Sequence, residues 1–208
     1  MTRKTQFWRV VFVLIAILFG YVAPLNADIV FTNIVGNCCG GYAVFGSDYG
    51  PESLAEQFIP AHNDILLDAQ AVVFNDDFGS PNFNVYLFTN AGGLPGIPIA
   101  TLATALAAPV GGGIVIASAA HPALLASTPY WLVLTPYEPA TWVGWELGGT
   151  IAVPQAFTID PSGLSGWTPN IPVALQFQID GVPEPSSMLL LGTGLLGAAG
   201  VVRRKMLL

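Results

Sequence analysis

The stretch Asn84-Val85-Tyr86-Leu87-Phe88-Thr89 has the pattern of a β-strand, in which successive side chains point to opposite sides. It is the clearest indication of the fold class in this sequence. In an extended strand, Val85 and Leu87 point to one side while Tyr86 and Phe88 point to the other. Residues 90–98, which follow it, are dense in glycine and proline and are expected to form a turn. A strand followed by a turn is the repeating unit of an all-β domain.

Short apolar runs separated by turn residues extend outward from this stretch in both directions. They cover residues 28–34, 42–45, 54–59, 65–74, 99–106, 113–118, 130–135, 141–147, 155–159 and 174–180. Roughly ten such strands predict a single all-β domain, a β-sandwich or jelly roll. Residues 100–108 are rich in alanine, so a short helix is an alternative there. The longest expected loop is residues 160–172.

Charge is distributed very unevenly along the chain. All six basic residues lie near the ends, at Arg3, Lys4, Arg9, Arg203, Arg204 and Lys205. Of the thirteen acids, all but Glu184 lie between residues 28 and 182, where there is no lysine or arginine. Such a domain has no lysine or arginine to offer to phosphate groups, which argues against nucleic-acid binding. Its fold must rest on apolar burial and hydrogen bonds rather than on lysine or arginine ion pairs.

The N-terminal residues 1–27 have the pattern of a secretory signal peptide. A basic start is followed by the apolar stretch 10–19, and Ala27 is a small residue before the expected cut. The mature protein would then begin at Asp28. The extracytoplasmic domain is expected to span residues 28–181.

The C-terminal residues 182–208 combine three features in order. Val182-Pro183-Glu184-Pro185 comes first, residues 186–202 carry no charge, and Arg203-Arg204-Lys205 follows. Residues 186–202 would form roughly 25 Å of helix, slightly less than a hydrocarbon core of about 30 Å. The basic side chains can reach the interface and predict a cytoplasmic C-terminus. A plain single-pass anchor is the simpler interpretation of this tail.

The order of Pro-Glu-Pro, short apolar span and basic cluster resembles the PEP-CTERM sorting signal of exported bacterial proteins. The resemblance implies recognition and cleavage near Val182-Pro183-Glu184-Pro185 by exosortase, a membrane-embedded cysteine transpeptidase. It also implies a transient stay in the inner membrane before delivery to the cell surface or extracellular matrix. Bacteria with this system usually make an exopolysaccharide, which is an expected partner.

The central region resembles the "choice-of-anchor" domains, which are extracellular and β-rich. The likeness rests on Asn84-Val85-Tyr86-Leu87-Phe88, on Gly93-Leu94-Pro95-Gly96 and on Thr128-Pro129-Tyr130-Trp131-Leu132-Val133-Leu134. It implies an extracellular β-domain and brings no catalytic residues with it.

Few residues suggest catalysis. His62 and His121 are the only histidines, and Gly163-Leu164-Ser165-Gly166-Trp167 departs from the G-x-S-x-G pattern at its last position. Glu138 and Glu146 offer a carboxylate pair of the kind that glycosidases use, but surface acids are the preferred interpretation. We therefore expect a non-enzymatic structural or binding protein. The alternative is a secreted hydrolase on a β-sandwich scaffold.

The cysteines and the acidic turns give no clear metal site. Cys38 and Cys39 are adjacent, and export favours a vicinal disulfide between them, although separate thiols or bonds to another molecule are alternatives. Residues 75–77, and Asp64 with Asp68, offer oxygen ligands for calcium without matching a known loop. Asn and Asp are common in turns, so we expect no metal and no cofactor.

Aromatic residues crowd two of the later strands. They are Tyr130, Trp131, Tyr137, Trp142 and Trp145, and they either fill the sandwich core or stack on sugar rings. Trp142 and Trp145 are three residues apart, so a regular strand points them to opposite faces. Only a bulge at Gly144 would bring both tryptophans to the same side.

Overall fold

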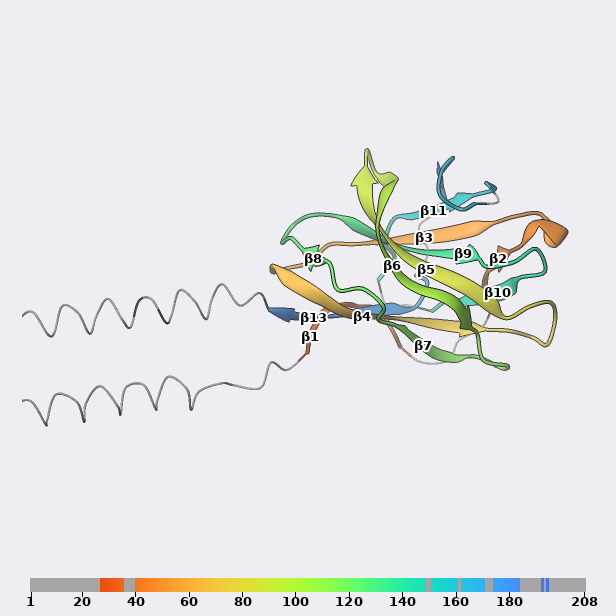
Figure 1. The fold of residues 1–208 in the computed structure, drawn as a ribbon, viewed down its shortest axis with the longest axis horizontal. Coiled ribbons are helices and arrows are strands. Elements are labelled where there is room, and N and C mark those ends of the chain that lie inside the picture. Colours follow the sequence, from red (N-terminus) through yellow and green to blue (C-terminus); the bar gives the residue numbers. More distant parts are fainter. Residues whose placement is uncertain are drawn as a thin grey trace, which may run out of the picture. The chain divides into compact units, whose positions relative to one another are not determined.

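Two antiparallel sheets pack face to face and confirm the predicted all-β sandwich (Figure 1). The computed structural model describes residues 27–35, 40–148, 151–160, 162–170 and 174–183, together with Gly192 and Gly194. All the strands lie within the compact unit Ala27–Pro183. The only helical element in the described part of this unit is the short 3-10 helix η1 (Ser47–Tyr49).

The first sheet, sheet A, contains seven strands. They are β1 (Asp28–Thr32), β2 (Gly41–Phe45), β4 (Asp64–Phe74), β7 (Gly113–Ala117), β8 (Ala123–Leu124), β10 (Trp142–Glu146) and β13 (Phe177–Pro183). β4 is the central strand. β7 and β8 pair along one of its edges, and β13 and β10 pair along the other. β4 can hold two strands on each edge because it is eleven residues long.

The second sheet, sheet B, contains six strands in the order β12-β11-β3-β9-β5-β6. Their bounds are β3 (Ser53–Phe58), β5 (Asn82–Ala91), β6 (Leu94–Ala107), β9 (Tyr130–Pro136), β11 (Gln155–Thr158) and β12 (Thr168–Pro169). Figure 1 shows β3 and β11 in one layer and β4 and β13 in the other.

The core lies between the inner faces of the two sheets. Trp145, Phe58, Phe83, Phe177 and Leu132 are among its large, fully buried side chains. Burial of each such side chain contributes roughly 1.5–3 kcal/mol, so apolar packing is the main stabilising term. This agrees with a domain that has no lysine or arginine for ion pairs.

A smaller apolar cluster covers part of the outer face of sheet B. Phe88 and Trp131 are fully buried there, and Trp167 packs against them from the loop that precedes β12. The Phe88 and Trp167 rings meet edge to face, with centroids 6.1 Å apart. Trp131 Nε1 donates a hydrogen bond of 3.0 Å to Asn90 Oδ1. This outer face of sheet B is therefore occupied by the protein's own loop.

The strands follow the sequence prediction with one correction and two additions. Residues 90–98 were expected in a turn, but β5 continues to Ala91, the turn contains only Gly92 and Gly93, both with positive φ, and β6 begins at Leu94. The helical alternative for residues 100–108 is wrong, because most of that stretch belongs to β6. The two-residue strands β8 and β12 are too short to give a sequence pattern.

The predicted membrane span at residues 186–202 lies outside the described residues, apart from Gly192 and Gly194. Within the described part of the chain, no helix is both long and apolar enough to cross a membrane.

Candidate functional site

Both histidines lie exposed in loops beside β4. His121 Nδ1 is 3.1 Å from the carbonyl oxygen of Leu66, which can only accept, so Nδ1 carries the hydrogen of this bond. Among the described residues, no hydrogen bond joins His62 or His121 to a serine or to an acid. The structure therefore brings no base and nucleophile together at either histidine.

Ser165 serves to shape a loop. Its hydroxyl donates a hydrogen bond of 2.6 Å to Asp160 Oδ2, and the Ser162 hydroxyl donates one of 2.7 Å to the same oxygen. The bond from Ser165 is the largest cause that lowers the pKa of Asp160 to about 2, and the bond from Ser162 is the second. An ionised acid that organises two serines in this way stabilises the turn but cannot accept a proton near neutral pH.

Glu138 and Glu146 differ in their surroundings. Glu138 Oε1 accepts hydrogen bonds from the Ser80 hydroxyl and the Asn82 amide, and these bonds lower the pKa of Glu138. Glu146 is only 5% exposed, which corrects the expectation of a surface acid for this residue. A Cβ at Gly112 would lie 2.5 Å from Glu146 Oε1, so the absence of a side chain at Gly112 leaves room for this carboxylate.

The two glutamates also lie too far apart for glycosidase chemistry. Ser80, which bonds the Glu138 carboxylate, bridges to Thr141 just before β10, whereas Glu146 ends β10, roughly 13 Å further along at about 3.3 Å per residue. Paired glycosidase carboxylates are separated by about 5–9.5 Å.

The residues considered for calcium differ in their surroundings. Asn75 is buried, and its Nδ2 donates hydrogen bonds to the carbonyl oxygens of Phe78 and Trp142. Asp76 and Asp77 are exposed beside it. Among the residues that the structure describes, no group of three or more His, Cys, Asp or Glu side chains is placed to hold a metal ion.

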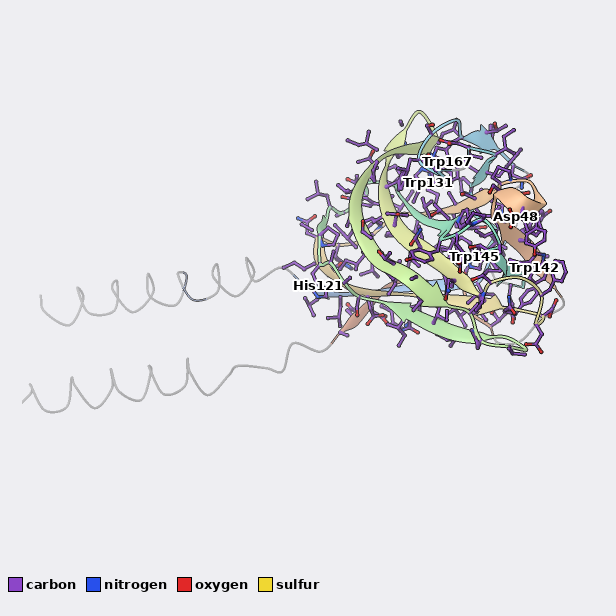
Figure 2. The ribbon with its side chains drawn as sticks, turned by 45° about the vertical axis from the view of Figure 1, so that its right-hand side comes forward. Asp48, His121, Trp131, Trp142, Trp145 and Trp167 are labelled. Atoms are coloured by element: carbon purple, nitrogen blue, oxygen red, sulfur yellow. The ribbon has the colours of Figure 1, made fainter. Side chains whose placement is uncertain are left out.

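The tryptophans of β10 face opposite sides of sheet A, as their spacing predicts. β10 pairs with β2 without a bulge, so Trp145 points into the core and is fully buried. Trp142 points outward and is partly exposed. Figure 2 shows Trp142 beside Asp48 at one end of the sandwich, with His121 at the opposite end.

Trp142 belongs to an aromatic cluster on the outer face of sheet A. Its members are Phe45, Tyr49, Phe74, Phe78 and Trp142, and neighbouring ring centroids are 5.2–6.5 Å apart. Tyr49 and Phe78 are the most open, with 41% and 53% of their surfaces exposed. The cluster joins β2, η1, β4, the loop after β4, and β10, so distant parts of the chain converge on it.

Two glycines create the space for this cluster. A Cβ at Gly144 of β10 would lie 2.1 Å from Phe74 Cζ, and one at Gly41 of β2 would lie 3.0 Å from Phe74 Cε1. The ring of Phe74 therefore rests against backbone that has no side chains, next to Trp142. Any larger residue at Gly144 would push Phe74 away from the sheet.

Beyond the aromatic cluster, the same face carries a ladder of acids and amides. This polar ladder consists of Asp68 and Gln70 on β4 and Gln178 and Asp180 on β13. Gln70 Nε2 donates to Asp180 Oδ2 at 2.7 Å and to Asp68 Oδ1 at 3.3 Å. Gln178 Nε2 donates to both oxygens of Asp180 at 2.9 and 3.0 Å.

Asp68 and Asp180 stand directly opposite each other across the two strands. Partial burial is the first cause that raises the pKa of Asp68, and repulsion from Asp180 adds to it, while the bond from Gln70 opposes the rise. Like charges in register destabilise a sheet by up to about 1 kcal/mol. Asp180 is only 8% exposed, and both of its oxygens accept hydrogen bonds from the ladder amides, so Asp68 is the more open carboxylate of the pair.

Glu56 is a buried acid of the kind often found at functional sites, and the sequence analysis did not identify it. It is fully buried in β3, on the core side between Leu54 and Phe58. Its Oε1 accepts a hydrogen bond of 3.3 Å from the Leu175 N–H, whereas its Oε2 has no partner in the described structure. Burial raises the pKa of Glu56 to about 9, against the opposing effect of the Leu175 N–H.

Gln155 lies opposite Glu56 on β11, and among the described residues its buried Nε2 has no hydrogen-bond partner either. The period of two places both residues on the core face and is the sequence signal that could have located them.

Several predicted site residues lie outside the described part of the chain. They are Cys38 and Cys39, Glu184 and Pro185, and the basic residues Arg203, Arg204 and Lys205. The vicinal disulfide, the Pro-Glu-Pro cleavage element beyond Pro183 and the basic stop therefore remain predictions.

Val182 and Pro183, in contrast, belong to β13. Val182 pairs with Ile65 and Pro183 with Asp64, so β13 extends two residues beyond the predicted end of the domain at residue 181. On its other edge, β13 pairs with β1, and Gly181 stands opposite Asp28. The first predicted residue of the mature protein thus lies beside the start of the C-terminal tail.

A comparison with known protein families matches residues 181–205 to the PEP-CTERM protein-sorting motif. The match confirms the sorting motif predicted from the tail, and the motif implies export, recognition by exosortase and sorting to the cell surface. A comparison of the chain with curated proteins found no match.

Proposed function

We propose that this exported protein is a non-enzymatic surface or matrix component that binds exopolysaccharide through the outer face of sheet A. The observation that carries the proposal is the aromatic cluster, in which Tyr49 and Phe78 remain open to solvent. Their ring centroids are 5.2 Å apart, and the planes are tilted by 44°. A sugar ring has apolar C–H faces that fit such aromatic surfaces, and each contact contributes through dispersion and the quadrupole of the ring.

The polar ladder supplies the second kind of contact that a sugar requires. Carboxylates accept hydrogen bonds from hydroxyls, and amides both donate and accept. Phe74 and the ladder residues Asp68 and Gln70 share β4, with the buried Val72 between Gln70 and Phe74. The polar groups and the aromatic cluster therefore follow one another along roughly 20 Å of strand between Asp68 and Phe74. A chain of sugar units would fit this length better than a small molecule would.

The negative charge of the domain limits which polysaccharides it can bind. The domain has twelve acids between residues 28 and 182 and no lysine or arginine, so it repels polyanions. We therefore propose a polysaccharide without acidic groups. The choice-of-anchor resemblance supports the same role, because such domains are extracellular modules that carry no catalytic residues of their own.

The test uses residues 27–183, which contain the whole hydrophobic core. Affinity electrophoresis through gels that hold a neutral glucan, an acidic polysaccharide or the host's own exopolysaccharide would measure retention. We expect Tyr49→Ala and Phe78→Ala each to weaken binding roughly five-fold, since one aromatic contact is worth about 1 kcal/mol. Ile97→Ala is the matched control, because Ile97 is an exposed apolar residue on sheet B.

Two results would contradict the proposal. A Tyr49→Ala/Phe78→Ala double variant that is retained as strongly as the parent would remove the aromatic cluster as the binding surface. Release of reducing sugar ends from any of these polysaccharides would favour the secreted hydrolase instead.

A further inference from the structure

The sorting motif and the folded sandwich share residues. The matched region begins at Gly181, and Gly181, Val182 and Pro183 are the last three residues of β13. No spacer separates the sheet from the Pro-Glu-Pro element. The start of the sorting motif is therefore part of the folded domain.

The end of β13 is firmly held in the sheet. Val182 and Pro183 pair with Ile65 and Asp64 of β4, and β8 pairs with the same two residues from the other edge. Gly181 is buried, and a Cβ there would lie 2.7 Å from Val30 Cγ2 and 3.1 Å from Asp64 Cβ. The strand ends at a proline because proline has no N–H with which to continue a ladder.

Backbone in the interior of a sheet cannot enter the site of a processing enzyme unless the strand first opens. Enzymes that cut peptides hold them in an extended form through free backbone groups. Those groups of β13 are used by β4 along the whole strand and by β1 as far as Gly181. Local opening of such a central strand is rare compared with opening of chain ends.

From these contacts we infer that the sandwich sets the N-terminal limit of the bond that is cut, so that processing falls after Pro183 and leaves β13 whole. The reaction breaks one peptide C–N bond. The carbonyl carbon passes to the nitrogen of an acceptor amine, or to the oxygen of water. The departing nitrogen gains the proton that the acceptor loses. The inference rests on processing at the sorting motif and specifies where that processing can occur.

A consequence follows for the product. The mature C-terminus is the end of an intact strand, so release from the motif costs the fold none of its pairing. A cut at or before Val182 would remove pairs between β13 and β4 and would leave Asp64 and Ile65 without their partners.

The test is the intact mass of the processed protein, obtained from full-length chain produced in cells with and without exosortase. We expect a product whose last protein residue is Pro183 or a later one. A product that ends at Val182 or earlier would overturn the inference while leaving exosortase processing intact. A chain that stays full length with exosortase present would instead remove the processing itself, and the inference with it.

A second variant checks the position independently. Insertion of Gly-Ser-Gly-Ser between Val182 and Pro183 keeps the Pro-Glu-Pro element and all of β13 except its last pair. The product should become heavier by the mass of the four inserted residues. A product with the parent's mass would place the cut before the insertion and contradict the inference.

Discussion

Buried Glu56 should lower the free energy of unfolding of the domain as the pH rises, and the size of this effect follows from its raised pKa. Its pKa is raised from 4.5 to about 9 in the folded state. The folded protein therefore keeps a proton that the unfolded chain releases between these two values. Stability is full below pH 4.5, decreases as the pH rises above it, and levels off near the folded pKa.

The free energy of unfolding should decrease by about 1.4 kcal/mol per pH unit, the value for one proton that the unfolded chain releases and the folded protein keeps. Between pH 5.5 and 8.5 the free energy of unfolding should then decrease by roughly 4 kcal/mol, a large part of the 5–15 kcal/mol that is typical of a domain. Acids with lowered pKa values, such as Glu138 and Asp160, are ionised in both states across this range and do not contribute to the slope.

Urea unfolding of residues 27–183 at several pH values would measure this slope. Glu56→Gln keeps the shape of the side chain and an oxygen for the Leu175 N–H but cannot ionise. The variant should therefore lose most of the parent's pH dependence and exceed the parent by up to about 4 kcal/mol at pH 8.5. A smaller decrease in the same direction should remain, because burial also raises the pKa of Glu52 and of Asp68. Asp48→Asn is the control, since Asp48 is exposed, and it should retain the parent's slope. A parent whose stability is constant or rises from pH 5.5 to 8.5 would refute the reasoning.

Three further outcomes can be measured on the same fragment. Gly144→Ala should displace Phe74 and lower the free energy of unfolding by about 1–3 kcal/mol, because its Cβ would lie 2.1 Å from the ring; unchanged stability would show that the cluster is loosely packed. Asp68→Asn should leave stability equal or raise it by up to about 1 kcal/mol, since it relieves the repulsion from Asp180; a clear loss would mean that the ladder is favourable as it stands. Added sodium chloride should raise the Tm at neutral pH by screening the acids, and calcium at equal ionic strength should do no more; a larger effect of calcium would reveal a cation site.

Local patterns were sufficient to predict most of the strands and the all-β class, but not which strands pair in each sheet. The period of two located most strands, and it correctly placed Trp145 inside and Trp142 outside. It failed at residues 94–98, where glycine and proline indicated a turn but the tight Gly92-Gly93 turn allows β6 to begin at once. The turn chemistry was identified correctly, and only the length of the turn was wrong.

The candidate site was harder to predict because it is assembled from segments that are distant in sequence. Tyr49, Phe78 and Trp142 come from three separate connections and strands, and only pairing across sheet A brings them together. Glu56 was missed for a different reason. Acidic side chains are usually exposed, so Glu56 between Leu54 and Phe58 does not look like a core residue, although the period of two places it on the core face with them.

Sorting by the C-terminal motif determines where this protein is delivered, and Glu184→Ala removes the only charge of the Pro-Glu-Pro element. The change leaves the uncharged residues 186–202 and the basic cluster intact, so insertion into the membrane should not be affected. Recognition of Pro183-Glu184-Pro185 should fail. We expect full-length protein to accumulate in the inner-membrane fraction and the surface form to disappear, whereas Glu138→Ala, a loss of an acid outside the motif, should be processed normally. Processing and delivery of Glu184→Ala at the parent's level would instead show that the tail is a plain membrane anchor.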